Sequence, residues 1–142
     1  MPRVIPLAAA VALLAVAPAQ AQSVPSRTFV KLTKVDTVDV GPAGDSVGDM
    51  TVFTFEVLDR VGGRRIGAGH GYCVRTEVGV ANDCLANSSL PGGRIILQWE
   101  EHDGQQVSHA AITGGTGRYR GARGELRLTS LSPTEVSTGG SA

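Results

Sequence analysis

Gly114-Gly115-Thr116-Gly117-Arg118-Tyr119-Arg120-Gly121-Ala122-Arg123-Gly124 is a stretch with five glycines in eleven residues. It separates two runs, Val107 to Thr113 and Gly124 to Leu131, that alternate as β-strands do. Glycine enters positive-φ regions at little steric cost, so this density predicts a tight, bulged corner between two strands. The stretch does not fit a phosphate loop, because G-x-G-x-x-G would need glycine where Arg120 stands.

The rest of the chain has the sequence pattern of an all-β fold. Turn-forming residues such as Pro91-Gly92-Gly93 and Asp103-Gly104 interrupt alternating segments throughout. A short helical turn is expected only between Ala43 and Gly48. The predicted strands are Thr28 to Val40, Met50 to Leu58, Arg64 to Thr76, Asp83 to Leu90, Gly93 to Glu101, Val107 to Thr113 and Gly124 to Leu131.

The two ends of the chain are predicted to lie outside the fold. Residues 1–21 have the pattern of a secretory signal peptide: Arg3, an apolar run, and Ala19-Gln20-Ala21 as cleavage site. The alternative is an uncleaved anchor, although the apolar run is short for a bilayer. Residues 22–132 would form one secreted β domain, and the small, polar residues 133–142 a flexible tail.

Charge excludes a nucleic-acid-binding role. The chain has 13 basic and 13 acidic residues, and removal of Arg3 would leave it one charge negative. Four arginines follow one another in the glycine-rich region, at positions 118, 120, 123 and 127. On a near-neutral chain such a cluster is typical of a solvated loop, with a local anion site as the alternative.

Cys73 and Cys84 are predicted to form a disulfide. The chain carries an export signal, and Gly79 and Asn82-Asp83 between the cysteines can reverse a strand. Two free thiols and half of a metal site are the alternatives. A metal site has no support from a CxxC pair or a second spaced ligand pair, so no metal is expected.

The run Ala-Ile-Thr-Gly-Gly-Thr-Gly-Arg-Tyr-Arg-Gly-Ala-Arg-Gly, Ala111 to Gly124, resembles the C-terminal signature of the allene oxide cyclase-like and dirigent-like barrel superfamily. Gly48-Asp49-Met50-Thr51-Val52-Phe53 is similar to the family's Gly-Asp step into its second strand. The resemblance covers roughly residues 27 to 131. It implies an eight-stranded antiparallel β-barrel with a central cavity, whereas alternation alone leaves a sandwich and a barrel equally open.

Strand parity indicates which side chains face the cavity. A small barrel without covering helices should turn its aromatic side chains inward, which makes Phe53, Phe55 and Trp99 the expected apolar walls. Leu97 shares a face with Trp99 and joins them as a substrate-binding candidate. The two phenylalanine side chains would instead face outward if a hydrophobic core lay outside the barrel.

Three polar residues are the catalytic candidates. Tyr72 would present a hydroxyl to the lumen, with a buried structural role as alternative. Glu56 would be a general acid if it faces inward, but solvent-exposed if the two phenylalanines do. His109 alternates with Val107 and Ala111 and faces either the cavity or water. Glu100 and Glu101 lie on opposite faces, so one of them would point inward unless the strand has already ended, and their terminal position favours solvent exposure.

The resemblance implies two classes of function. The first is a cofactor-free cyclase or isomerase that folds a small apolar or polyketide-like substrate inside the lumen. The second is a non-catalytic, dirigent-like module that binds a phenolic or other apolar ligand, or guides its stereochemistry. A barrel with a filled lumen is the third possibility. The resemblance also implies a homodimer or homotrimer, and no membrane contact is expected after signal cleavage.

Overall fold

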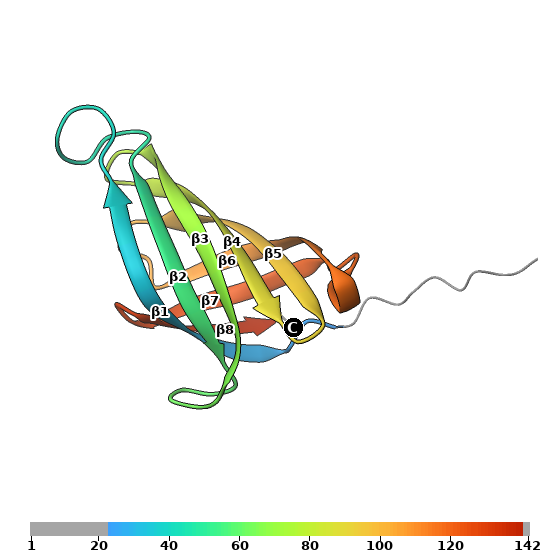
Figure 1. Cartoon of the computed structure of the whole chain (residues 1–142). Helices are drawn as coiled ribbons and strands as arrows, with labels where there is room; N and C mark the ends of the chain where they lie inside the picture. The colour runs from blue at the N-terminus through green and yellow to red at the C-terminus, as the bar shows by residue number, and fades with distance from the viewer. Residues whose placement is uncertain (1–22, 141–142) are drawn as a thin grey trace, which may run out of the picture.

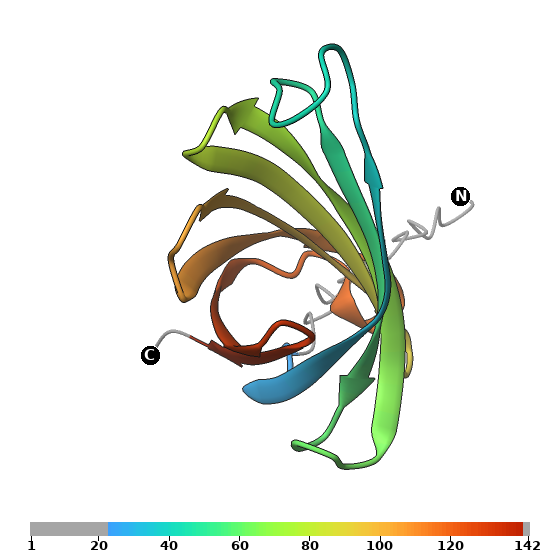
Figure 2. The same cartoon turned by 90° about the vertical axis from the view of Figure 1, so that its left-hand side faces the viewer.

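Eight antiparallel strands close into one barrel in the computed structural model, which describes residues 23–140 (Figures 1 and 2). Each strand pairs with the next along the chain, and the last pairs with the first. The predicted all-β, eight-stranded barrel is therefore confirmed. The strands are β1 (Arg27–Val38), β2 (Met50–Leu58), β3 (Arg65–Glu77), β4 (Ala81–Leu90), β5 (Gly93–His102), β6 (Val107–Gly115), β7 (Gly124–Ser132) and β8 (Glu135–Gly140).

The eighth strand corrects the prediction of a flexible tail. Glu135–Gly140 pairs with β1 on one side and β7 on the other, so it closes the wall. The buried hydroxyl groups of Thr28 and Thr138 share a hydrogen bond of 2.7 Å across this seam. A polar segment is stable here because both of its backbone edges are hydrogen-bonded. The predicted signal peptide lies outside the described residues.

The glycine-rich stretch forms the predicted corner. Its centre is η1 (Gly117–Tyr119), a single 3₁₀ turn, and it is the only helix in residues 23–140. Such a turn is far too short to cross a membrane. Gly117 has a φ of +59°, and a Cβ atom there would lie 2.2 Å from the carbonyl oxygen of Gly92. No other residue fits this position, because both the backbone angle and the space exclude a side chain.

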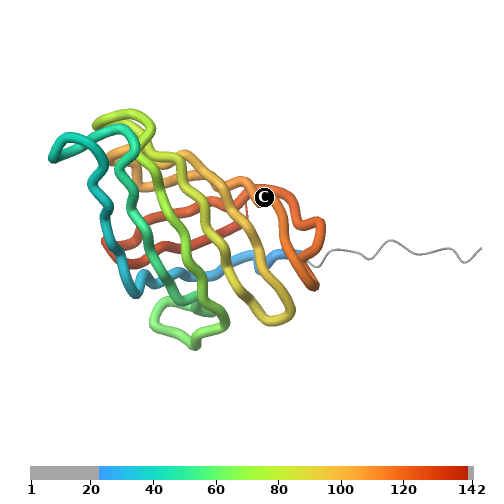
Figure 3. Tube along the Cα trace, turned by 45° about the horizontal axis from the view of Figure 1, so that its top comes forward, coloured from blue at the N-terminus to red at the C-terminus, as the bar shows by residue number. Residues whose placement is uncertain are grey.

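The segment between β1 and β2 contains no helical turn, contrary to the expectation for Ala43 to Gly48. It is a loop of bends organised by Asp49, whose carboxylate accepts hydrogen bonds from the backbone N–H groups of Val40 and Ser46, both at 2.8 Å. The bond from Val40, followed by that from Ser46, lowers the pKa of Asp49. Figure 3 shows this loop projecting beyond the strands.

Two phenylalanines of β2 occupy the inner face of the barrel because the neighbouring strand carries glycines opposite them. Phe53 pairs with Gly71 and Phe55 with Gly69. A Cβ atom at Gly69 would lie 2.2 Å from Cζ of Phe55, and one at Gly71 2.8 Å from Cζ of Phe53. The rings therefore lie directly over the glycine backbone, an arrangement that also covers glycines in designed sheets.

The two ends of the barrel differ. One end, the plugged end, is filled by a buried apolar cluster against which Val24 and Leu90 pack; its members are Ile95, Leu97, Ala110, Ile112, Tyr119, Ala122 and Leu126. The other end, the mouth, is formed by the segments 34–50, 75–83, 99–107 and 130–136. Strand ends and loops rich in polar residues border it.

Candidate functional site

The interior of the barrel contains a cavity of about 600 Å³. That volume lies within the range of small-molecule sites in proteins. The four residues predicted as walls, Phe53, Phe55, Leu97 and Trp99, all line it. The two phenylalanine rings lie 6.2 Å apart and are tilted by 34°, so they form one continuous aromatic surface.

The cavity opens at the mouth. Val35 and Gln105 line it and are exposed, Val35 to 50%. The barrel wall is also interrupted at this end. Strand β5 pairs with β6 only from Ile95 to Gln98, and the two strands are not paired beyond that point. A ligand can therefore enter from the mouth, while the apolar cluster closes the opposite end.

Polarity changes along the cavity. Its inner part is mostly apolar and includes the hydroxyl groups of Thr28, Ser88 and Thr138. Near the mouth the polar lining residues are more numerous: Asn82, Gln105, Ser108, Ser130 and Ser132. Among the described residues, only two charged side chains line the cavity, Arg75 and Glu101. A bound molecule would therefore have an apolar body toward the plugged end and polar contacts toward the mouth.

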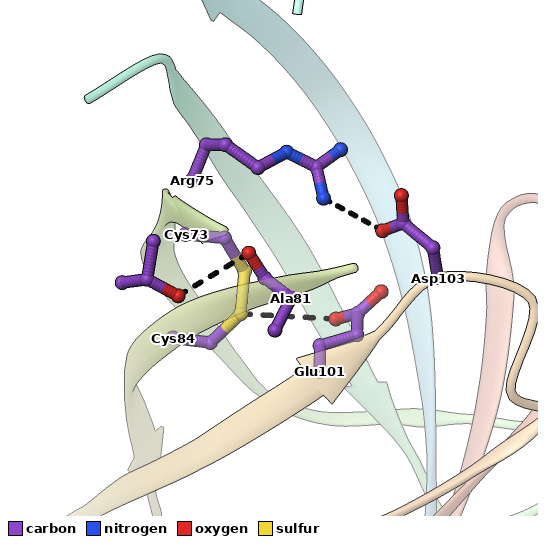
Figure 4. The surroundings of a disulfide bond; sticks show 7 residues. Cys73, Arg75, Ala81, Cys84, Glu101 and Asp103 are labelled. Carbon is purple, nitrogen blue, oxygen red and sulfur yellow. Dashed lines mark hydrogen bonds and ion pairs between the residues drawn. A yellow bond between two sulfur atoms is a disulfide. The ribbon is translucent and has the colours of Figure 1, made fainter. Parts of the chain in front are cut away.

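Arg75 is engaged by two carboxylates of the mouth loops. Its Nε lies 2.8 Å from Oδ1 of Asp45. Its Nη1 lies 2.8 Å from Oδ1 of Asp103 (Figure 4). The hydrogen bond to Asp103 is the main reason that the pKa of Arg75 is raised. The guanidinium side chain is only 17% exposed. Arg75 thus joins the β1–β2 and β5–β6 loops to β3, and two carboxylates already face its single positive charge.

Glu101 is the other charged group. Its Oε2 lies 3.7 Å from Sγ of Cys84, and Figure 4 shows its carboxylate directed toward the disulfide. No basic side chain among residues 23–140 forms an ion pair with it. Among residues 23–140, Glu101 is therefore the one carboxylate in the cavity lining that can accept a proton or a hydrogen bond from a ligand.

Cys73 and Cys84 form the predicted disulfide between directly opposed positions of β3 and β4. Cys84 is 2% exposed, and Cys73 lines the cavity. The sulfur atoms and Glu101 are close enough to suggest a three-ligand metal site. However, the two sulfurs are bonded to each other, so neither is the thiolate that a metal would require. The bond instead fixes the mouth end of β3 against β4.

Replacement of both cysteines by alanine is expected to reduce the free energy of unfolding by about 2–3 kcal/mol, because the bridge closes a loop of 11 residues in the unfolded chain. Chemical denaturation of the wild-type chain and of the Cys73→Ala/Cys84→Ala variant measures this difference. A reducing agent should destabilise the wild type by a similar amount and leave the variant unchanged. Equal stability of the two oxidised proteins would contradict the expectation.

The three predicted catalytic residues lie outside the cavity. Tyr72 is 39% exposed and borders a depression on the outer surface. A carboxylate oxygen of Glu56 lies 3.7 Å from Nη1 of Arg65. Nδ1 of His109 lies 2.7 Å from Oε1 of Glu125, on exposed positions of β6 and β7. None of the three would contact a molecule held in the lumen.

The charged lining residues were not among the predicted site residues, although the sequence contains a signal for each. Glu101 follows Leu97 and Trp99 at intervals of two, which places all three on one face of a strand. Arg75 shares a face with Cys73 by the same rule. Glu101 is exposed, as expected, but β5 continues to His102, so the side chain also keeps its place on the cavity face of the strand.

Comparisons with known proteins agree with this architecture. The family model described as "Allene oxide cyclase barrel like domain" matches residues 29–139. Among curated proteins, none matches the chain significantly. The solved structure of a pyocyanin demethylase is similar, with 30% identity and a TM-score of 0.69 over 79% of this chain and 94% of that one.

Two pterocarpan synthase dirigent proteins share the fold. One has 16% identity and a TM-score of 0.62, with 79% of this chain and 81% of that chain covered. The other has 13% identity and the same TM-score, with 79% and 86% covered. At these identities the likeness concerns the fold alone. The demethylase is more similar to this chain in sequence than either dirigent protein is.

Proposed function

Because the chain belongs to the allene oxide cyclase barrel-like family, we propose that its lumen binds a small aromatic or polyketide-like molecule and converts it as a cofactor-free cyclase or isomerase. The observation that carries this proposal is the 600 Å³ cavity, with aromatic walls at Phe53, Phe55 and Trp99 and one unpaired carboxylate at Glu101. Pockets of this kind combine apolar enclosure with a few polar groups that orient the ligand.

Confinement would supply much of the rate enhancement. A flexible chain that is folded against rigid walls has already lost the freedom that opposes ring closure, and this can lower a barrier by several kcal/mol. The walls suit that role because Phe55 is 5% exposed and Leu97 is 8% exposed, so both are held by packing on their other sides.

Proton transfer would be the task of Glu101. In an isomerisation, its carboxylate takes a proton from an acidic C–H group of the substrate, and the same proton returns to another atom of the resulting enolate. No net proton or electron is consumed. The proposal assigns this step to Glu101 rather than to Tyr72, Glu56 or His109, since those three side chains lie outside the lumen.

The similar demethylase is named for pyocyanin, a tricyclic aromatic compound, so tricyclic aromatics are the first ligands to test. Secretion is part of the proposal: the disulfide fits an oxidising compartment, as does the signal-peptide pattern of residues 1–21. A dirigent-like role would appear in experiments as ligand binding without any conversion or proton exchange.

Ala86→Phe is expected to weaken binding of acridine, a neutral tricyclic probe at pH 8, by at least about tenfold. Ala86 lines the cavity and is 3% exposed, so a phenyl group there would occupy ligand volume. Trp99 is the chain's only tryptophan, and quenching of its fluorescence reports events in the cavity.

Asn87→Phe is the matched control, because Asn87 is adjacent in β4 but borders the outer depression beside Tyr72. Its affinity for acridine should stay within about twofold of the wild type. Thermal melts of both variants verify folding, and Ser88→Phe provides a second blocking substitution in the cavity. Wild-type affinity in folded Ala86→Phe and Ser88→Phe would mean that the probe does not bind in the lumen.

A further inference from the structure

The charges around the lumen indicate which ligands it would accept. Arg75 has one positive charge and contacts two carboxylates, Asp45 and Asp103, so this group of three is already negative by one charge. Glu101 adds a second negative charge, and no cation among the described residues pairs with it. The charged part of the cavity lining therefore has an uncompensated negative potential.

The whole mouth is acidic, which the neutral composition of the chain conceals. Its four segments contain ten of the 13 acidic residues, whereas Lys34 and Arg75 are their only lysine or arginine residues. The other described arginines and lysines lie outside the mouth, toward the plugged end and on the outer wall. A molecule that approaches the opening therefore meets a field of one sign, and such a field attracts cations and repels anions.

We propose that the lumen selects a cationic aromatic ligand over neutral or anionic ligands of the same shape. This inference rests on the proposed function of the cavity as a small-molecule site. Glu101 would provide the counter-charge, and Trp99, two residues earlier on the same face of β5, an aromatic face for the cation. Tryptophan is the side chain whose ring attracts a cation most strongly.

The ligand's orientation follows from the same geometry. The positive centre lies near the mouth, between Trp99 and Glu101, and the ring system extends toward Phe53 and Phe55. An anionic analogue gains little from Arg75, because the two carboxylates of Asp45 and Asp103 already outweigh the single charge of that guanidinium. Fatty-acid-like carboxylates are therefore poor ligands for this barrel, even though its walls are apolar.

Three acridines of nearly equal shape test the proposal: 10-methylacridinium as the cation, acridine at pH 8 as the neutral probe and acridine-9-carboxylate as the anion. Titration calorimetry and Trp99 quenching measure each affinity. The wild type should bind the cation at least about fivefold more tightly than acridine and the anion more weakly than either, as expected for one close charge in a partly solvated site. Added salt should reduce this preference.

Glu101→Gln should lower the affinity for 10-methylacridinium by about five- to tenfold and leave acridine binding within about twofold. Glu100→Gln is the matched control, because Glu100 is the neighbouring residue, faces outward and pairs with His102. That variant should change the affinity for the cation by less than about twofold. Thermal melts establish that both variants fold.

The results distinguish failure of the small-molecule site from failure of its charge selection. If none of the three acridines binds, the proposed small-molecule site fails. If acridine binds in the lumen but the cation binds no better, or if Glu100→Gln and Glu101→Gln reduce cation binding equally, the site stands and the charge selection is overturned. A cation preference that disappears only in Glu101→Gln supports the proposal.

Discussion

A chain that ends at Ser132 is expected not to fold. The missing segment contains β8, which pairs with both β1 and β7 and contributes Val136 and Thr138 to the lumen wall. Without it, two long strands would expose unpaired backbone groups at an open edge, and such edges promote aggregation. Far-UV circular dichroism and thermal melting of the truncated chain should show no cooperative transition.

A chain that ends at Gly140 is the matched control, because it keeps every paired residue of β8. It should melt as the full chain does. A cooperative melt of the chain ending at Ser132, close to that of the control, would show that the barrel closes without β8. That outcome would restore the interpretation of residues 133–142 as a tail.

Glu101→Gln is expected to slow enzyme-promoted proton exchange by at least about 100-fold, because a positioned general base contributes about 10²- to 10⁴-fold to such steps. The probe is 2-tetralone, an apolar bicyclic ketone with acidic C–H groups next to its carbonyl. Proton NMR in D₂O follows the replacement of those hydrogens by deuterium. The wild type should accelerate the exchange above the buffer rate, since the ketone would lie between the aromatic walls and the Glu101 carboxylate.

Two variants make the exchange experiment specific. Glu100→Gln removes a carboxylate from the outer face of the same strand, where it pairs with His102, and should keep the wild-type rate. Ala86→Phe fills the lumen and should lose exchange together with acridine binding. Acridine binding with no exchange above buffer in the wild type would favour the dirigent-like, non-catalytic function. Equal rates in the two glutamine variants would exclude Glu101 as the base.

The β-strands were predictable from sequence because they alternate and their turns contain glycine, proline and asparagine, whereas their closure into a barrel was implied only by the family resemblance. The bounds of β2, Met50–Leu58, agree with the prediction. The last strand was not predictable in this way. Glu135–Gly140 contains one large apolar side chain, Val136, and its pairing with two neighbours, rather than its own composition, stabilises it. Such stabilisation by tertiary context leaves no local pattern.

The cavity walls were predictable, but the polar residues within the cavity were harder to identify. Phe53 and Phe55 face inward because β3 presents Gly69 and Gly71 opposite them. Because glycines have no side chain, Gly69 and Gly71 give no pattern from which the orientation of β3 can be predicted. In the structure Cys73 faces the lumen, so the adjacent Tyr72 faces outward. To predict which side chains of a strand face the lumen, the orientation of one of its residues must be known. That orientation depends on long-range strand pairing, which the sequence of the strand does not reveal.

The seam between β1 and β8 has a mechanical consequence. Arg27 is paired with Gly139 and Lys31 with Glu135, so both ends of the described chain leave the barrel side by side at the plugged end. A force that pulls the two ends apart would act first on the hydrogen bonds of the residue pair nearest to them. The pairs along the seam between β1 and β8 would then break one after another. Each of these hydrogen bonds contributes only about 1 kcal/mol of net stability. The barrel would therefore peel open at low force along this seam, while strands sheared along their length would yield only at a higher force.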